Sequence, residues 1–123
     1  MGWYRCDYSC ANNTKNISVA MKAFLDKLLE FLHSCDIIED RKLNEMGFLL
    51  PEEGIVLINP DLIPNLDEYY LTILHEFAHW AFKELTDAEV EENIVRWYSN
   101  PKVRKVLEAE LGVPEWLEED GDE

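Results

Sequence analysis

Two helix-start signals that follow one another closely in the second half of the chain constrain the fold most strongly. The segment Asn65-Leu-Asp-Glu68 has the spacing of a capping box, in which a polar side chain and an acid three residues later satisfy free N–H groups at a helix start. Apolar residues recur at helical spacing as far as about Leu85, and Thr86-Asp-Ala-Glu89 then repeats the signal. The chain is therefore expected to form a long helix, to turn very tightly and to return as a second helix.

The segments on either side of these two helices complete an α+β domain. Apolar residues within 16–35 recur every three or four positions, as in an amphipathic helix that covers a core. Two apolar runs, 46–50 and 55–58, flank a turn with proline first and glycine last, so they are predicted to pair as a β-hairpin. Pro101 is expected to start a last helix, which Gly112 ends.

The composition is typical of one globular domain over residues 1–123, with no nucleic-acid partner and no membrane insertion. The 123 residues are 47% hydrophobic and 30% charged. Lys and Arg number 11 against 26 for Asp and Glu, and the resulting net charge of −15 argues against binding nucleic acid or anionic lipid. No apolar run approaches the roughly 18 residues that would span a bilayer.

The two ends of the chain carry expectations of their own. Residues 1–15 lack helical periodicity but are rich in aromatic side chains, so this N-terminal segment is expected to lie against the domain. Residues 113–123 form an acidic C-terminal tail. The first residues contain no apolar segment of the kind found in signal peptides, so we expect a cytoplasmic protein in which Cys6, Cys10 and Cys35 are reduced thiols.

One segment carries recognisable chemistry, the run His75-Glu-Phe-Ala-His79 within the long predicted helix. Residues four apart lie on one face of a helix, so the two imidazoles are placed as a pair of ligands to one Zn²⁺ ion. Glu76 follows the first histidine, about 100° around the helix, where its carboxylate can act on a metal-bound water without being a ligand. The alternative is a pair of exposed histidines on an ordinary surface helix.

A third zinc ligand is expected from the next helix, which offers three acids. An acid in the first turn, such as Glu89, is expected to fall short of the metal, and Glu89 also has the capping-box role. Glu91 borders the face predicted to point inward, whereas Glu92 points nearly the opposite way. We predict Glu91 as the third ligand, with Glu92 and Glu89 as alternatives.

An H-E-x-x-H helix followed by a glutamate helix resembles the gluzincin metallopeptidases, and the size and order of the elements look most like the minigluzincins. The resemblance covers residues 16–110 and implies a small zincin-like domain with a backing helix, a short β-hairpin or sheet, an active-site helix and a glutamate helix. It also implies a zinc-dependent endopeptidase that acts on a peptide or protein substrate. In such an enzyme Glu76 is first the general base and then the general acid.

The resemblance also bears on how a substrate binds. It implies that the substrate lies extended along an edge strand, and Ile55–Ile58 is our candidate strand. Tyr98 is the nearest candidate donor to the developing oxyanion, although the role of a packed aromatic residue is favoured for it.

Minigluzincins are similar in being held latent, as zymogens, by terminal segments. The acidic tail, Cys6 or Cys10 is therefore a candidate inhibitory ligand, within one molecule or through self-association, although a solubilising role is favoured for the tail. The rival function is a catalytically silent zinc-binding interaction or regulatory module on the same scaffold. Glu76 argues against that rival, because a structural zinc site needs ligands but no general base.

Overall fold

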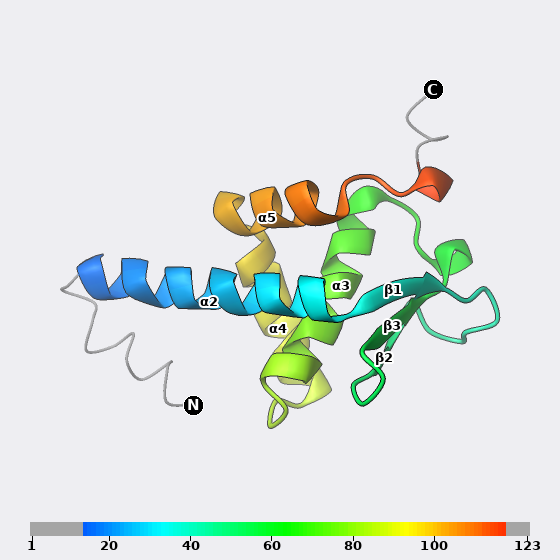
Figure 1. The fold of residues 1–123 in the computed structure, drawn as a ribbon, viewed down its shortest axis with the longest axis horizontal. Helices are drawn as coiled ribbons and strands as arrows, with labels where there is room; N and C mark the ends of the chain where they lie inside the picture. The colour runs from blue at the N-terminus through cyan, green and yellow to red at the C-terminus, as the bar shows by residue number, and fades with distance from the viewer. Residues whose placement is uncertain (1–13, 118–123) are drawn as a thin grey trace.

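The structure, a computed structural model, describes the backbone of residues 14–117 and the side chains of residues 21–117 (Figure 1). It is an α+β fold, as predicted. The expectations for the first thirteen residues, including Cys6 and Cys10, and for the last six residues of the acidic tail lie outside the described residues. The elements follow one another as α2 (Thr14–Ser34), β1 (Asp36–Glu39), β2 (Gly47–Leu50), β3 (Ile55–Ile58), a 3-10 turn (Pro60–Leu62), α3 (Leu66–Ala81), α4 (Asp87–Tyr98) and α5 (Pro101–Leu111).

The three strands form one mixed sheet in the order β1-β3-β2. The predicted hairpin is confirmed, because β2 and β3 pair antiparallel with Gly47 opposite Ile58 and Leu50 opposite Ile55. Strand β1 was not predicted; it pairs parallel to β3. Since β3 is the central strand, the expectation that Ile55–Ile58 is an edge strand is wrong, and β2 is the edge strand that packs against α3.

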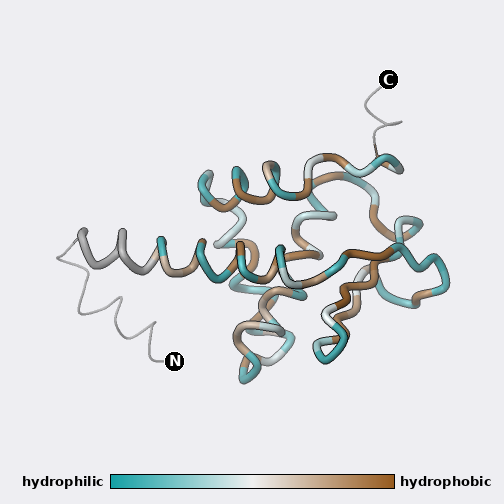
Figure 2. The backbone as a smooth tube through the Cα atoms, in the orientation of Figure 1, coloured by the Kyte–Doolittle hydropathy of each residue, from teal (hydrophilic) through white to brown (hydrophobic). Residues whose placement is uncertain are grey.

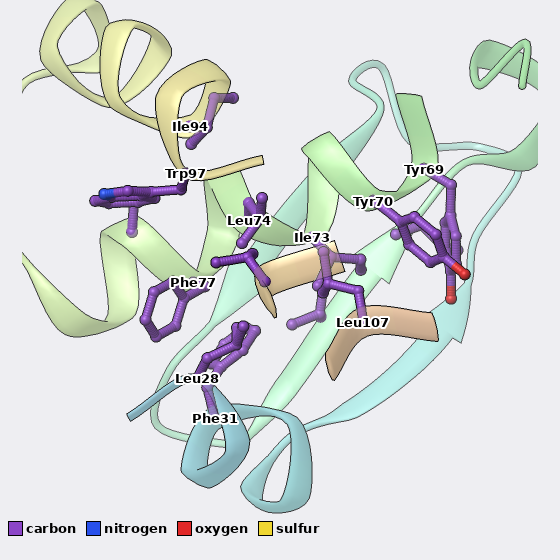
Figure 3. Packing of buried hydrophobic residues seen from close by; sticks show 14 of the residues in the cluster. Leu28, Phe31, Tyr69, Tyr70, Ile73, Leu74, Phe77, Ile94, Trp97 and Leu107 are labelled. Carbon is purple, nitrogen blue, oxygen red and sulfur yellow. The ribbon is translucent and has the colours of Figure 1, made fainter. Parts of the chain in front are cut away.

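Phe77 of α3 lies at the centre of the core and determines how α3 is rotated. Its buried ring lies 5.5 Å from the ring of Phe24, 5.6 Å from that of Phe31 and 6.1 Å from that of Trp97, measured between centroids. Figure 3 shows Phe31 of α2 and Trp97 of α4 on different sides of Phe77. His75 and His79 are each two residues from Phe77, about 200° around the helix, so the packing of Phe77 turns both imidazoles away from the core.

Both predicted helix starts are confirmed. The Asn65 side chain accepts from the backbone N–H of Glu68, and Thr86 and Glu89 form a reciprocal capping box. Helix α3 nevertheless ends at Ala81, four residues before the predicted end, because Phe82 leaves the helical conformation. The Phe82 ring packs 5.7 Å from Trp97, so apolar residues beyond the helix end enter the core through a turn rather than through another helical turn.

The last helix closes the domain beside α2 (Figure 1). Pro101 is its first residue and Gly112, with a φ of 62°, ends it, as predicted. The Tyr70 hydroxyl donates to the Gly112 carbonyl oxygen at 2.7 Å, and the third histidine, His33, lies 2.7 Å from a carboxylate oxygen of Glu110. These contacts tie α5 to α3 and to the end of α2.

Hydropathy along the chain follows this packing. Figure 2 shows hydrophobic residues along the strands and along one side of the helices, with hydrophilic residues in the turns. None of the helices within residues 14–117 combines the length and the hydropathy of a membrane-crossing helix. Cys35 is a free, buried thiol, and its burial, with the charge of Asp36, raises its pKa above the ordinary value, so it remains protonated.

Candidate metal centre

The two predicted histidine ligands lie side by side on α3, and both are half-buried. The Nε2 atoms of His75 and His79 are 3.1 Å apart, and the ring centroids are 4.8 Å apart. Two ligand atoms that hold one Zn²⁺ at about 2.0–2.1 Å with tetrahedral angles lie about 3.3–3.4 Å from each other. The two imidazoles therefore already have nearly the separation that a shared ion requires.

Asp87, which the sequence analysis did not consider, completes a group that can hold a metal ion. Its Oδ1 atom lies 3.1 Å from Nε2 of His79, and one ligand atom from each of His75, His79 and Asp87 lies within 4.8 Å of the others. Asp87 is the first residue of α4, so the expectation that first-turn acids fall short of the metal is wrong for this residue. The signal available in the sequence was its place directly after the helix cap, across the tight turn from His79.

Glu91, the predicted third ligand, contacts the other histidine through its other nitrogen. Its Oε2 atom lies 3.0 Å from Nδ1 of His75. It stands one helical turn after Asp87, so both carboxylates are on the same face of α4. Glu89 is engaged in the capping box, and Glu92 is exposed and does not line the cleft described below. The structure thus brings two carboxylates, Asp87 and Glu91, to the histidine pair.

Glu76 occupies a different environment from the two carboxylates of α4. Only 6% of its surface is exposed, and no hydrogen bond joins its carboxylate to another described residue. Burial raises its pKa to about 7, and the negative charges of Glu45 and Asp87 add to the shift. Glu76 therefore has a buried carboxylate that lines the same cavities as His75.

Gly47 of β2 lets the edge strand approach this carboxylate closely. A Cβ atom at residue 47 would lie 2.7 Å from Cγ2 of Thr72 and 3.3 Å from Oε2 of Glu76. Gly47 has an ordinary negative φ, unlike Gly54 and Gly112, so lack of space rather than backbone conformation favours glycine here. Strand β2 and helix α3 are packed together at the level of Glu76.

A cleft with two arms opens over the site. The larger arm, of about 700 Å³, includes Lys83 and is called the Lys83 arm; the smaller, of about 380 Å³, includes Glu68 and is called the Glu68 arm. Both arms share the residues at their junction, Glu45, Gly47, His75, Glu76 and Glu91. His75, Glu76 and Glu91 therefore lie where the two arms meet, whereas His79 and Asp87 line the Lys83 arm alone.

Tyr98 does not take part in this site. Its hydroxyl donates to Oδ1 of Asp67 at 2.6 Å, and Tyr98 lines neither arm of the cleft. Burial and the hydrogen bond to Asp67 raise the pKa of Tyr98 above its usual range. The expectation that Tyr98 donates to an oxyanion at the centre is therefore not met, and its packing against Tyr70 fits the alternative role.

Comparisons of the chain with protein-family models, with curated proteins and with solved structures found no match. The resemblance to gluzincins therefore stays a prediction that rests on the H-E-x-x-H helix and on the order of the elements.

Proposed function

We propose that this protein is a zinc-dependent endopeptidase of the gluzincin type. Its metal would be held by His75, His79 and a carboxylate from α4, and Glu76 would be the general base and acid. The observation that carries the proposal is the paired Nε2 atoms at 3.1 Å, with a buried glutamate beside them at the junction of an open cleft. A purely structural metal site needs neither the buried acid nor the cleft.

The donor set fits Zn²⁺, which binds imidazole nitrogens and carboxylate oxygens in tetrahedral sites. A bound Zn²⁺ would polarise the carbonyl of the scissile bond and lower the pKa of a water molecule at the site. The carboxylate of Glu76 would accept a proton from the attacking water and pass it to the leaving amine. Because Glu76 is held between α3 and β2, its carboxylate stays close to the histidines throughout.

The substrate would lie extended along β2. This strand borders the cleft, and Gly47, Phe48 and Leu49 line the Lys83 arm. The side of β2 that faces away from β3 pairs with no other described strand, so its backbone groups can pair with a peptide. This assignment replaces Ile55–Ile58, which lies in the middle of the sheet.

The identity of the third ligand can be tested by comparing three variants. Asp87→Asn and Glu91→Gln remove the two carboxylates that contact the histidines, and Glu92→Gln is the matched control on the same helix. We predict that loss of the ligand weakens zinc binding by more than about 100-fold, whereas loss of an orienting partner weakens it by about 10- to 100-fold. Glu91 is the ligand that the sequence predicts; Asp87, whose Oδ1 lies beside Nε2 of His79, is the alternative, and the larger loss identifies the ligand. Equal affinity in all three variants would exclude both.

The general base is tested by Glu76→Gln. We expect one Zn²⁺ per chain in both proteins and a loss of cleavage of an unstructured protein substrate by about 100-fold or more in the variant. Glu84→Gln, an exposed acid that lines neither arm, is the control. Unchanged cleavage in Glu76→Gln would contradict the mechanism. Zinc binding without cleavage of any substrate would favour the silent interaction module instead.

Latency through the C-terminal tail is tested separately. Leu117 is buried and the Trp116 ring lies 5.5 Å from that of Tyr69, so the packed domain extends to residue 117. A chain that ends at Leu117 removes the acidic residues without cutting the core. Faster cleavage by the shortened chain would support inhibition, and equal rates would support the solubilising role.

A further inference from the structure

The Glu68 arm differs in character from the rest of the cleft. Four apolar side chains line it: Met46, which directly precedes β2, Leu71 of α3, and Ile94 and Val95 of α4. The Thr72 hydroxyl lies 3.8 Å from the Met46 sulfur, which holds the methionine side chain at the arm's wall. The arm can therefore accommodate the apolar stem of a long side chain.

Four of the six polar side chains that line the Glu68 arm are carboxylates, and the other two are Thr72 and His75. Glu68 lies at one end, Glu45 and Glu91 lie at the junction with the other arm, and no lysine or arginine is among the described residues that line it. The Lys83 arm, by contrast, includes a lysine that partly offsets Asp87. Among the described lining residues, the Glu68 arm therefore has carboxylates and no lysine or arginine, whereas the Lys83 arm has a lysine.

The arm also reaches the carboxylate of Glu76. Glu76 lines it, is 6% exposed and makes no hydrogen bond to another described residue. A buried carboxylate that borders a cavity, with no hydrogen-bond partner among the described residues, can accept a hydrogen bond from a bound ligand or from water there. This observation is independent of the acids at the rim.

We propose that the Glu68 arm binds a lysine or arginine side chain of the substrate, adjacent to the bond that is cleaved. The proposal rests on the proposed peptidase function and extends it to substrate specificity. Lysine and arginine bury an apolar stem and keep a charged end group in polar surroundings, which matches an apolar hollow rimmed by carboxylates. An acidic side chain would meet the like charges of Glu68 and Glu45 there, and a neutral one would leave these two carboxylates without a cationic partner.

The test compares two fluorogenic peptides that differ only in arginine against citrulline, its neutral analogue, at each position around the cleaved bond. We expect kcat/KM to be about tenfold or more higher with arginine at one fixed position on one side of the bond, and little changed at remote positions. Glu68→Gln should reduce this ratio at least about threefold, and Glu45→Gln, on a different element, should reduce it too. Glu92→Gln is the control and should leave the ratio unchanged.

A binding measurement separates this inference from the peptidase proposal. Fluorescence anisotropy of the labelled arginine and citrulline peptides is recorded with the full metal-free chain and its Glu68→Gln variant. Tighter binding of the arginine peptide that is lost in Glu68→Gln would support the inference that the Glu68 arm binds a basic side chain, even if no peptide were cleaved. Absence of cleavage would overturn the peptidase function alone. Equal binding of the two peptides would overturn the inference, as would a preference for arginine that Glu92→Gln removes as readily as Glu68→Gln. Cleavage of both peptides at equal rates would overturn the inference but would still support the peptidase function.

Discussion

The close packing of β2 against α3 at Gly47 gives a sharp prediction for Gly47→Ala. The new Cβ would lie 2.7 Å from Cγ2 of Thr72, whereas carbon atoms in ordinary contact lie about 3.5–4.0 Å apart. The threonine methyl cannot rotate away easily, because its side chain is β-branched and its hydroxyl donates to the Glu68 carbonyl oxygen at 2.7 Å. The strand must therefore move away from the helix by about 1 Å.

The expected magnitude follows from two opposing effects. Over-packing of this kind destabilises a fold by about 1–3 kcal/mol, while replacing glycine by alanine at a position with ordinary φ stabilises it by about 0.4–1 kcal/mol through the unfolded chain. We expect a net loss of about 1–2 kcal/mol in the free energy of unfolding, measured by urea denaturation. Because β2 borders Glu76, a shift of about 1 Å should also reduce cleavage by up to about 100-fold.

A second substitution isolates the cause. Thr72→Ser removes the methyl group that the new Cβ meets and keeps the hydroxyl that bonds to Glu68. In the double variant Gly47→Ala/Thr72→Ser the nearest remaining contact is Oε2 of Glu76 at 3.3 Å, so most of the lost stability should return. If Gly47→Ala alone is as stable as the natural chain, or if Thr72→Ser does not rescue it, the packing explanation is refuted.

Three predictions concern the supports of the site. Thr86→Ala removes the capping box at the start of α4 and should lower the free energy of unfolding by about 1 kcal/mol, whereas Thr86→Ser should be nearly neutral in the same urea titration. Tyr70→Phe removes the hydrogen bond to Gly112 and should lower stability by about 1 kcal/mol; an unchanged denaturation midpoint would show that this bond contributes nothing. Burial raises the pKa of Tyr69 to about 12, above its unfolded value near 10. The contribution of the neutral Tyr69 to the free energy of unfolding is therefore fully present below pH 10 and is lost as the pH rises towards 12. Unfolding measured across this range should show the loss in the natural chain and a smaller loss in Tyr69→Phe.

Local patterns in the sequence predicted the helices, their caps and the hairpin, because each depends on residues close together in the chain. Strand β1 was missed for the opposite reason. It has just two apolar residues, Ile37 and Ile38, between acids, and its pairing partner β3 lies almost twenty positions further on. Which strand is central also depends on such non-local pairing, and this is why the edge strand was assigned wrongly.

The histidine pair could be predicted because both ligands lie on one helix, whose periodicity sets their spacing. The carboxylate could not be predicted with the same precision, because it depends on how α4 crosses α3. The expectation that first-turn acids fall short is wrong for Asp87, whose Oδ1 lies 3.1 Å from Nε2 of His79. The turn between the helices brings the start of α4 nearer to the histidines than helix phase alone indicates, since Phe82 folds back against Trp97.

The imidazoles come from α3 and the facing carboxylates from α4, so an ion bound between them would cross-link the two helices on either side of the turn. Metal binding would then raise the free energy of unfolding by about 1.4 kcal/mol for each tenfold rise in the free ion concentration above the dissociation constant. Loading with zinc could thus be followed by thermal melting alone, before any substrate is known.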